Sequence, residues 1–392
     1  MKILSVNSGS SSLKASLYEM DNQTLIINVI FERIGLDNTF YTINYNNEKT
    51  KKERLFKNHE EAIQIFLEEL INLEVIKNLS EIKGIGHRVV HGADKYKIST
   101  KIDDDVIIDI ETFSHLAPLH NPPNLVGIRA FKKLLPDTLS VAVFDTSFHQ
   151  TMNNDAYIYP VPYEWYSKYG VRKYGFHGIS HHYISERISE ILNNKDLKVI
   201  SCHLGNGGSI TAIKDGKCID TSLGFTPISG IMMGTRCGDI DVSIIPYMMK
   251  QTNNTITEIM NQLNKNSGLL GVSGISNDLR EIEAGIKKKN ERCILANKLY
   301  INKILMYISY YNTILGGTDV IVFTAGVGEN SSLIREEVMN QLQSLGVEID
   351  QKSNEVRGKE TKITTDDSKI SCYVIPTNEE LMIAKEVLKF IE

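Results

Sequence analysis

Several features that would mark a specialised class of protein are scarce in this sequence. Its cysteines form no Cys-x-x-Cys pair and no zinc spacing, which favours free thiols in a reducing cytoplasm. No apolar run approaches the length of a membrane span, and the start is apolar too briefly for a signal peptide. A net charge of −5 argues against a nucleic-acid-binding protein. We therefore expect a cytoplasmic protein that binds neither nucleic acid nor a membrane.

The composition is that of a soluble globular protein, with 42% hydrophobic and 23% charged residues. A chain of 392 residues is too long for one compact core and suits two or three domains. The stretch from Thr151 to Tyr174 is rich in tyrosine, asparagine and proline and has weak periodicity. We place a domain boundary near its start.

Two glycine- and serine-rich turns each lie between apparent strands. Val199–Ile213 reads as a strand, the turn Leu204-Gly205-Asn206-Gly207-Gly208 and a second strand. Near the N-terminus, Ile3–Asn7 leads through Ser8-Gly9-Ser10-Ser11 into an alternating Ser12–Leu17. A glycine turn exposes N–H donors to which an anion can bind, although an ordinary hairpin is the simpler interpretation of one such loop. Two copies half a chain apart indicate a duplicated architecture with a nucleotide between the halves.

Two charged residues interrupt apolar strands in the first half of the chain. Arg88 follows Ile85-Gly86-His87, and burying it requires either an anionic ligand or a carboxylate partner. Asp145 ends the apolar strand Leu139–Phe144, where α/β folds carry catalytic or metal-positioning groups; a helix N-cap is the alternative.

The second half holds further candidates in glycine-flanked segments. His177 lies in Tyr174–Gly178, with Ser180 expected to cap the following helix, and Arg236 lies in the irregular loop Ile231–Asp241. A buried strand ending at Thr324 precedes an Ala325–Asn330 glycine turn and a helix, which is a nucleotide-binding arrangement without a Rossmann or P-loop spacing. Thr377 and Glu380 form an expected capping box, which leaves Glu379 available for another role.

Taken together and in order, eight motifs resemble those of the acetate kinase family over the whole chain. They are Asn7–Lys14, Gly86–Gly92, Phe144–Thr146, Tyr174–Gly178, His203–Gly207, Gly234–Asp239, Phe323–Asn330 and Thr377–Glu380. The resemblance implies an α/β fold of two duplicated actin-like (ribonuclease-H-like) domains, with mixed sheets flanked by helices and an ATP cleft between them. The implied domains are 1–149 and 150–376, with a C-terminal helix of about 377–392 packing back on the first.

The implied activity is reversible phosphoryl transfer from ATP to acetate, which gives acetyl phosphate and ADP by direct in-line attack of the carboxylate. ATP and ADP are then co-substrates, Mg²⁺ is the metal with Mn²⁺ as a substitute, and the protein is a homodimer. A small carboxylate is already ionised at neutral pH, so no general base is needed. The chemistry instead requires alignment of two anions and compensation of charge on the transferring group.

The resemblance also assigns roles to individual positions. The catalytic residues are Arg88, Asp145, His177, Asn206 and Arg236; the acetate-binding residues are Arg88, Val90, Leu119 and Pro227; Asn7 and Glu379 are placed at the metal. The nucleotide-binding residues are Ser10, Ser12, Lys14, His203, Leu204, Gly205, Asn206, Gly207, Asp278, Leu279, Arg280, Gly326, Val327, Gly328, Glu329 and Asn330. Among these, His203 is expected to support the turn rather than to take part in the reaction.

Three positions depart from the family pattern: Ala93 and Cys237 replace a glycine and a serine, and Ser229 stands where a glutamate is usual. A propionate or butyrate kinase of the same family is one alternative, since one methylene changes binding by only about 1–3 kcal/mol. A non-catalytic ATP-switched binding protein on the same fold is another, but it gives no role to two loop arginines. A sugar kinase would need a base and many polar groups for hydroxyls.

Overall fold

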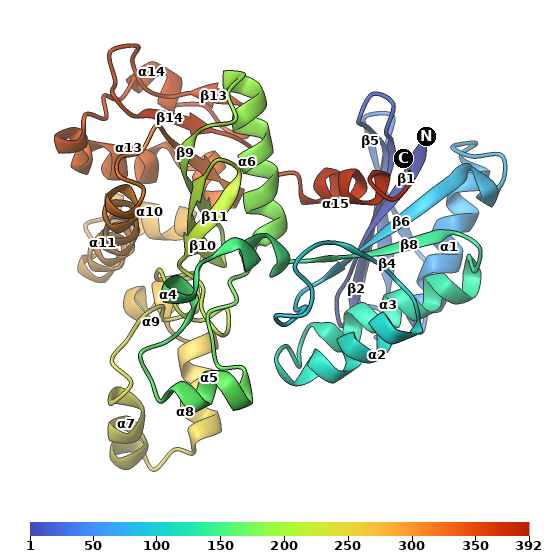
Figure 1. Ribbon diagram of the computed structural model, residues 1–392, viewed down its shortest axis with the longest axis horizontal. Helices are drawn as coiled ribbons and strands as arrows, with labels where there is room; N and C mark the ends of the chain where they lie inside the picture. Colours follow the sequence, from blue (N-terminus) through green and yellow to red (C-terminus); the bar gives the residue numbers. More distant parts are fainter. Residues whose placement is uncertain (392) are drawn as a thin grey trace. The chain divides into compact units, whose positions relative to one another are not determined.

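The computed structural model describes residues 1–391, which form two compact units. Unit 1 comprises Met1–Phe148 and the segment beginning at Asn378, and unit 2 comprises His149–Thr377. Each unit has a mixed sheet flanked by helices (Figure 1), which confirms the predicted fold class. Within residues 1–391, no helix combines the length and apolar character needed to cross a bilayer.

The sheet of unit 1 has the strand order β5-β4-β3-β2-β1-β6-β8-β7. Its strands are β1 (Lys2–Ser8), β2 (Ser12–Glu19), β3 (Thr24–Glu32), β4 (Phe40–Tyr45), β5 (Glu48–Glu53), β6 (Ile82–Val89), β7 (Thr100–Lys101) and β8 (Leu139–Phe144). Its helices are α1 (His59–Asn72), α2 (Asp104–Thr112), α3 (Asn121–Leu134) and α15 (Glu379–Leu388). Asn58 caps α1 as its position predicts, because its side chain accepts a hydrogen bond from the Glu61 N–H.

Strand β6 determines where the helices of unit 1 pack. Successive side chains of a strand point to opposite faces, so Gly86 and Arg88 share one face and His87 faces the other. A Cβ at Gly86 would lie 2.3 Å from Ile383 of α15, so only glycine allows this helix to approach. The opposite face is covered by α3 (Figure 1). There His87 packs edge to face on Phe131 of α3. Arg88 therefore lies on the face covered by α15.

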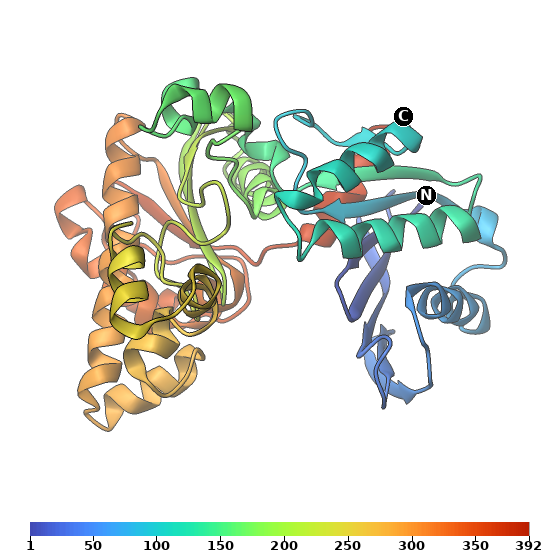
Figure 2. The same cartoon turned by 90° about the horizontal axis from the view of Figure 1, so that it is seen from below.

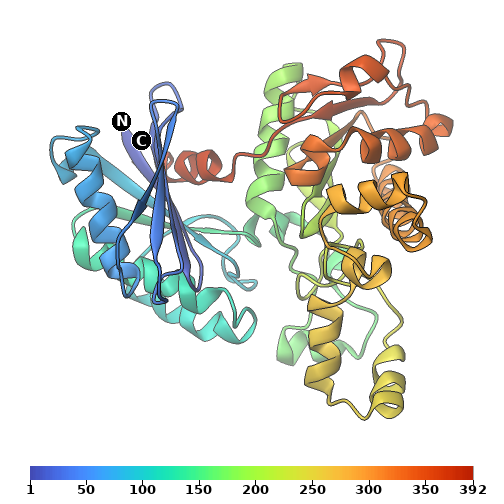
Figure 3. The same cartoon turned by 180° about the vertical axis from the view of Figure 1, so that it is seen from behind.

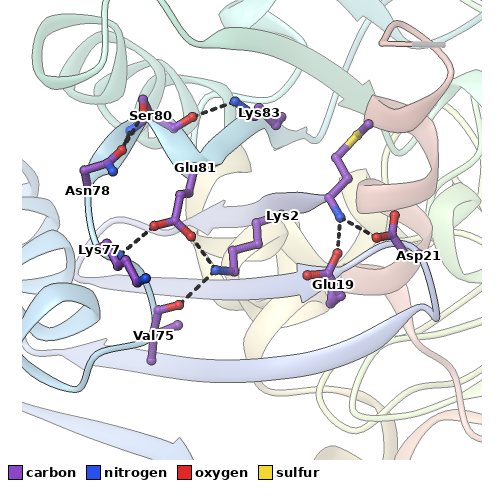
Figure 4. Close-up of polar contacts among 10 residues, drawn as sticks. Lys2, Glu19, Asp21, Val75, Lys77, Asn78, Ser80, Glu81 and Lys83 are labelled. Carbon is purple, nitrogen blue, oxygen red and sulfur yellow. Dashed lines mark hydrogen bonds and ion pairs between the residues drawn. The ribbon is translucent and has the colours of Figure 1, made fainter.

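Polar contacts hold the start of the parallel strands β1 and β6, at the end opposite to Arg88. Lys2, at the start of β1, donates to the Val75 carbonyl at 3.1 Å and to Glu81 at 2.7 Å (Figure 4). The hydrogen bonds from Lys2 and from the Lys77 N–H lower the pKa of Glu81 to about 2. These contacts tie the start of β1 to the segment that leads into β6.

The sheet of unit 2 has the order β11-β10-β9-β12-β14-β13. Its strands are β9 (Lys198–Leu204), β10 (Gly208–Lys214), β11 (Lys217–Thr221), β12 (Val320–Thr324), β13 (Thr361–Lys362) and β14 (Ser371–Val374). Its helices are α4 (Asn154–Tyr157), α5 (Tyr163–Tyr169), α6 (Gly178–Leu192), α7 (Ile244–Thr252), α8 (Ile256–Lys265), α9 (Gly268–Ser273), α10 (Leu279–Lys287), α11 (Glu291–Ile314), α12 (Ala325–Asn330), α13 (Ser332–Gln341) and α14 (Gln351–Asn354).

The core of unit 2 lies between its sheet and helices α11 and α13. Ile200, Ile321 and Phe323 of the sheet pack in one apolar cluster with Ile304 of α11 and Val338 of α13. Figure 2 shows the long α11 beside the sheet, and Figure 3 shows α10, α11 and α13 grouped together, with α6 on the other side. The central strands of unit 2 thus have helices on both faces.

The two sheets repeat one plan. The orders β3-β2-β1-β6-β8 and β11-β10-β9-β12-β14 are equivalent. In each, the first two pairings are antiparallel and the next two are parallel. The two hairpins singled out in the sequence, β1–β2 and β9–β10, occupy the same place in this plan. The duplicated architecture is confirmed.

Three local predictions are wrong. Asn378, not Thr377, caps α15, because its side chain accepts from the Leu381 N–H. Ser180 lies inside α6, which begins at Gly178 with His177 in the cap position. The Ala325–Asn330 segment is not a turn before a helix but the short helix α12 itself, and Ser331 caps the next helix.

Candidate active site

In unit 1, Arg88 and Asp145 form a two-pronged ion pair at the ends of β6 and β8. Arg88 Nη2 lies 2.6 Å from Asp145 Oδ2, and Nε lies 3.2 Å from Oδ1. The Asp145 N–H donates to the Val89 carbonyl at 2.9 Å, which fixes the carboxylate beside the arginine. The carboxylate partner that the sequence left open for Arg88 is thus present, and Asp145 is not a helix cap.

Glu379, the first residue of α15, adds a second carboxylate to this pair. Burial raises the pKa of Glu379 and the nearby Asp145 raises it further, while Arg88 opposes both effects. Burial alone would lower the pKa of Arg88, but Asp145 and Glu379 outweigh it and raise that pKa. The Arg88 side chain is only partly buried, so one cation and two carboxylates meet at an accessible position of unit 1.

The N-terminal hairpin contributes a polar wall to unit 1. Asn7 and Lys14 are paired across β1 and β2, and Lys14 forms an ion pair with Glu380, the neighbour of Glu379. Ser10 and Ser12 lie exposed in or beside the turn. Three predicted nucleotide-binding residues and Asn7, predicted at the metal, therefore share one hairpin.

The residues of the predicted acetate pocket have different surroundings. Val90 follows β6 directly and is half-buried, and its N–H donates to Asn124, which also donates to the Ser8 carbonyl. Leu119 is 74% exposed. Pro227 belongs to unit 2, where its carbonyl accepts from Arg236 at 3.1 Å. Sequence reasoning missed Asn124, which ties the ends of β1 and β6 together.

In unit 2, the Leu204–Gly208 turn gathers three of the predicted catalytic residues. The Gly205 N–H donates to Gly207 O, and the Asn206 carbonyl accepts from the Gly234 N–H, both at 3.0 Å. A Cβ on Gly207 would lie 3.2 Å from Arg236 Nη1 and 3.6 Å from His177 Nε2. Arg236 and His177 therefore approach the bare backbone of the turn next to Asn206.

Arg236 lacks the charge compensation that Arg88 has. Its contacts are the Pro227 carbonyl at 3.1 Å and the Met233 sulfur at 3.7 Å, and no carboxylate among residues 1–391 pairs with it. Burial lowers its pKa. A partly buried guanidinium next to exposed backbone is a site for an anion.

His177 and His203 lie under the same turn. Their rings stack with centroids 4.2 Å apart, and His203 Nδ1 lies 2.8 Å from the Ser180 hydroxyl. His177 has a left-handed backbone with φ +58°, which is costly for a residue with a side chain and is typical of functional positions. These contacts suit His203 to the supporting role that we expected.

A pocket of about 520 Å³ adjoins the turn within unit 2. It is lined by Gly205, Asn206, Leu269, Asn277, Asp278, Leu279, Arg280, Glu283, Gly326, Val327, Asn330, Ser331 and Arg357. Half of the predicted nucleotide-binding residues are in this list. Asn277 donates to Asn206 Oδ1 at 3.0 Å and so joins the pocket to the turn.

Several predicted nucleotide-binding residues of unit 2 do not line the pocket. Gly328 packs against the backbone of Phe323, Glu329 accepts from the Thr377 N–H at 3.1 Å, and His203, Leu204 and Gly207 lie in or below the turn. Sequence reasoning missed Leu269, Asn277, Glu283, Ser331 and Arg357. Only Asn277 and Ser331 carried a local signal, since Asn277 precedes the cap of α10 and Ser331 is itself the cap of α13.

Few side chains in the described part of the chain are available to hold a metal ion. Residues 1–391 contain no group of three or more His, Cys, Asp or Glu side chains arranged to hold a metal ion. The pair of Asp145 and Glu379 supplies only two carboxylates. This is the number with which Mg²⁺ is typically bound when waters and substrate phosphates complete its shell.

Two α/β units of one plan, one of them with a ligand-sized pocket beside an uncompensated arginine, define an anion-binding protein of duplicated design. The chain belongs to the acetokinase family, whose model matches residues 2–385. It is 50% identical to the acetate kinase of Clostridium novyi, over 100% of this chain and 99% of that one. The crystal structure of Porphyromonas gingivalis acetate kinase is 44% identical, with a TM-score of 0.95 and full coverage of both chains. A propionate kinase structure from Francisella tularensis is 40% identical, with a TM-score of 0.92 and 99% coverage of both.

Proposed function

We propose that this protein catalyses reversible phosphoryl transfer between ATP and acetate, giving acetyl phosphate and ADP. The observation that carries the proposal is Arg236, a partly buried cation without a carboxylate partner beside the Asn206–Gly207 turn and its pocket. Membership of the acetokinase family and the full-length likeness to acetate kinases support acetate as the acceptor.

Arg88 is the proposed anchor of the acetate carboxylate. Asp145 engages its Nε and one Nη, which orients the guanidinium and leaves other N–H donors for the substrate. An acetate oxygen then forms a bond to the γ-phosphorus while the bond from that phosphorus to the bridging oxygen breaks and ADP leaves. No proton is transferred, because the attacking carboxylate is already ionised.

Arg236, Asn206 and His177 are the proposed groups that stabilise the transferring phosphoryl. Its transition state spreads negative charge over three equatorial oxygens, so donors aimed at those oxygens lower the barrier. The turn adds backbone close to the γ-phosphate, because Gly207 has no side chain to keep the phosphate away. The pocket residues Asp278, Gly326 and Asn330 are proposed to hold the adenosine.

Mg²⁺ is the proposed metal, with Mn²⁺ as a substitute, held by Glu379 with Asp145 and Asn7 nearby. The donor set fits: two carboxylates and an amide are hard oxygen ligands, and a cation would offset the cost of ionising the half-buried Glu379. When bound, the ion would neutralise charge on the ATP phosphates. Asp145 would continue to orient Arg88.

Propionate is the second candidate acceptor, because one full-length neighbour is a propionate kinase structure. Val90, Leu119 and Pro227 are proposed to line the acyl pocket. A small apolar pocket separates acids that differ by one methylene only modestly, by about 1–3 kcal/mol. We expect acetate to be preferred and propionate to react more slowly.

A homodimer and a cytoplasmic location complete the proposal. An exposed apolar stripe on α11 supports self-association; it consists of Leu295, Leu299, Met306, Tyr310 and Ile314, which recur at helical spacing on one side. Five free thiols support a reducing compartment.

Replacement of Arg236 by alanine tests the proposal at the residue that carries it. We expect kcat of acetate-dependent ADP formation to fall by on the order of 10³ or more, as for arginines that stabilise charge in phosphoryl transfer. Arg187→Ala is the control, since that arginine pairs with Glu360 on the surface of unit 2. A tenfold loss or less for Arg236→Ala would show that Arg236 is peripheral.

A further inference from the structure

A buried chain of hydroxyl and imidazole groups lies behind the Leu204–Gly208 turn. Ser209 Oγ lies 2.9 Å from His177 Nδ1 and 2.8 Å from His181 Nε2. His181 Nδ1 in turn lies 2.8 Å from Ser201 Oγ. The side chains of Ser201, Ser209 and His181 are fully buried. His177, one end of the chain, faces the turn with its other ring nitrogen.

The number of protons in this chain is limited. A serine hydroxyl donates one hydrogen bond, and a neutral imidazole has one N–H and one acceptor nitrogen. Burial, assisted by His149 and His203, lowers the pKa of His181 well below its ordinary value, so this ring is neutral. Ser209 therefore donates to one histidine and accepts from the other.

Two electropositive features lie close to His177. The residue occupies the cap position of α6, a 15-residue helix whose N-terminal end is electropositive. Arg236 approaches the same glycine, Gly207, as the His177 ring. A neutral His177 carries a single proton, either on Nδ1 or on Nε2, and the direction of the chain decides which.

We infer that Ser209 is a positioning residue that donates to Nδ1 of His177 while accepting from Nε2–H of His181, so that His177 carries its proton on Nε2. This nitrogen faces Gly207, where the proposed function puts the transferring phosphoryl group. An Nε2–H donates to the phosphoryl oxygens, whereas a bare Nε2 repels them. The hydrogen-bond distances suit either direction of the chain, so the choice of this direction rests on the proposed function, which needs a donor at Nε2.

The proton position is measured directly by ¹⁵N NMR of histidine-labelled protein. The His177 resonances are assigned from the spectrum of His177→Gln. We expect the wild-type protein to show a protonated Nε2 and an acceptor Nδ1 for His177, with and without ADP. A protonated Nδ1 in the wild-type protein overturns the inference. Because this readout needs no turnover, it is observed separately from a failure of the proposed function, in which no acid is phosphorylated.

Kinetics of Ser209 variants give the second test. We expect Ser209→Ala to lower kcat by roughly ten- to a hundredfold, as for other groups that orient an active-site histidine, with unchanged KM values for acetate and ATP. Ser209→Thr, which keeps the hydroxyl, should restore most of the rate. Undiminished kcat in Ser209→Ala overturns the inference.

Thr211→Val is the matched control. Thr211 lies two residues further along β10 on the same face, is equally buried, and shares its hydroxyl with Thr221 at 2.9 Å rather than with a histidine. We expect it to retain wild-type kcat. Circular dichroism and ADP titration of every variant identify those that have lost the fold. If Thr211→Val loses as much kcat as Ser209→Ala, the effect of Ser209→Ala is due to packing and the inference is overturned.

Discussion

The two arginines that the sequence proposes for the site, Arg88 and Arg236, have opposite electrostatic surroundings. Arg88 is held by the Asp145 carboxylate, so its geometry is fixed before a substrate arrives. Arg236 contacts a carbonyl and a thioether, so its charge has no opposite partner among the described residues. The first arrangement suits the orientation of a small carboxylate, and the second suits the stabilisation of charge that develops during transfer.

Glu379→Gln tests the proposed metal site at the scale of one residue. We expect the Mg²⁺ concentration for half-maximal activity to rise by roughly ten- to a hundredfold, because the amide keeps the shape of the side chain but loses the charge. The measurement is a Mg²⁺ titration of initial rate at saturating ATP and acetate. Glu380→Gln is the control, since Glu380 pairs with Lys14. Equal Mg²⁺ requirements in the two variants would remove Glu379 from the site.

Helices and hairpins whose ends depend on neighbouring residues could be predicted from the sequence. Those whose ends depend on contacts with distant residues could not. Both hairpins follow from alternation around a small-residue turn, and α1 follows from Asn58. At the start of α15, the predicted cap Thr377 was one residue before the cap in the structure, Asn378. Thr377 was unavailable for capping because its N–H bonds to Glu329 and its hydroxyl to Ser180, contacts that no local pattern contains.

Gly86→Ala tests the packing of α15 on β6. The added Cβ would meet Ile383 at 2.3 Å and Val387 at 2.8 Å, so the helix must shift. We expect a loss of about 1–3 kcal/mol in the free energy of unfolding, measured by urea denaturation. The Mg²⁺ concentration for half-maximal activity should also rise, because Glu379 moves with its helix. Adding Ile383→Ala should relieve part of the strain, so strictly additive losses in the double variant would contradict this account.

For the whole molecule, the sequence indicated the duplication but only part of the pocket. The repeated turn motif indicated the shared plan of both sheets. The motifs included the turn and the residues of α12, and the family resemblance added Asp278. Glu283 and Arg357 line the same pocket from segments without any motif. Their position depends on how α10 and the chain after α14 pack, which is a long-range property of the fold.

Acid stability of the whole protein should depend on His87. Burial lowers the pKa of His87 to about 3, whereas an unfolded histidine titrates near 6.5, so below that pH the unfolded state binds more protons. The contribution of the neutral, buried His87 to the free energy of unfolding is complete above pH 6.5. It is lost as the pH falls toward 3, by about 1.4 kcal/mol per pH unit. We expect the free energy of unfolding of His87→Leu to fall less than that of the wild type as the pH is lowered from 6.5 toward 3. Parallel curves for the two proteins would refute this.

The central claim, transfer of a phosphoryl group to a carboxylate, is tested most directly by trapping the product. The wild-type protein is incubated with ATP, Mg²⁺ and hydroxylamine, with acetate, propionate or butyrate in parallel, and the acyl hydroxamate is measured. We predict acetyl hydroxamate in the largest amount, less from propionate, and none without ATP. The absence of acyl hydroxamate from every acid would contradict the account.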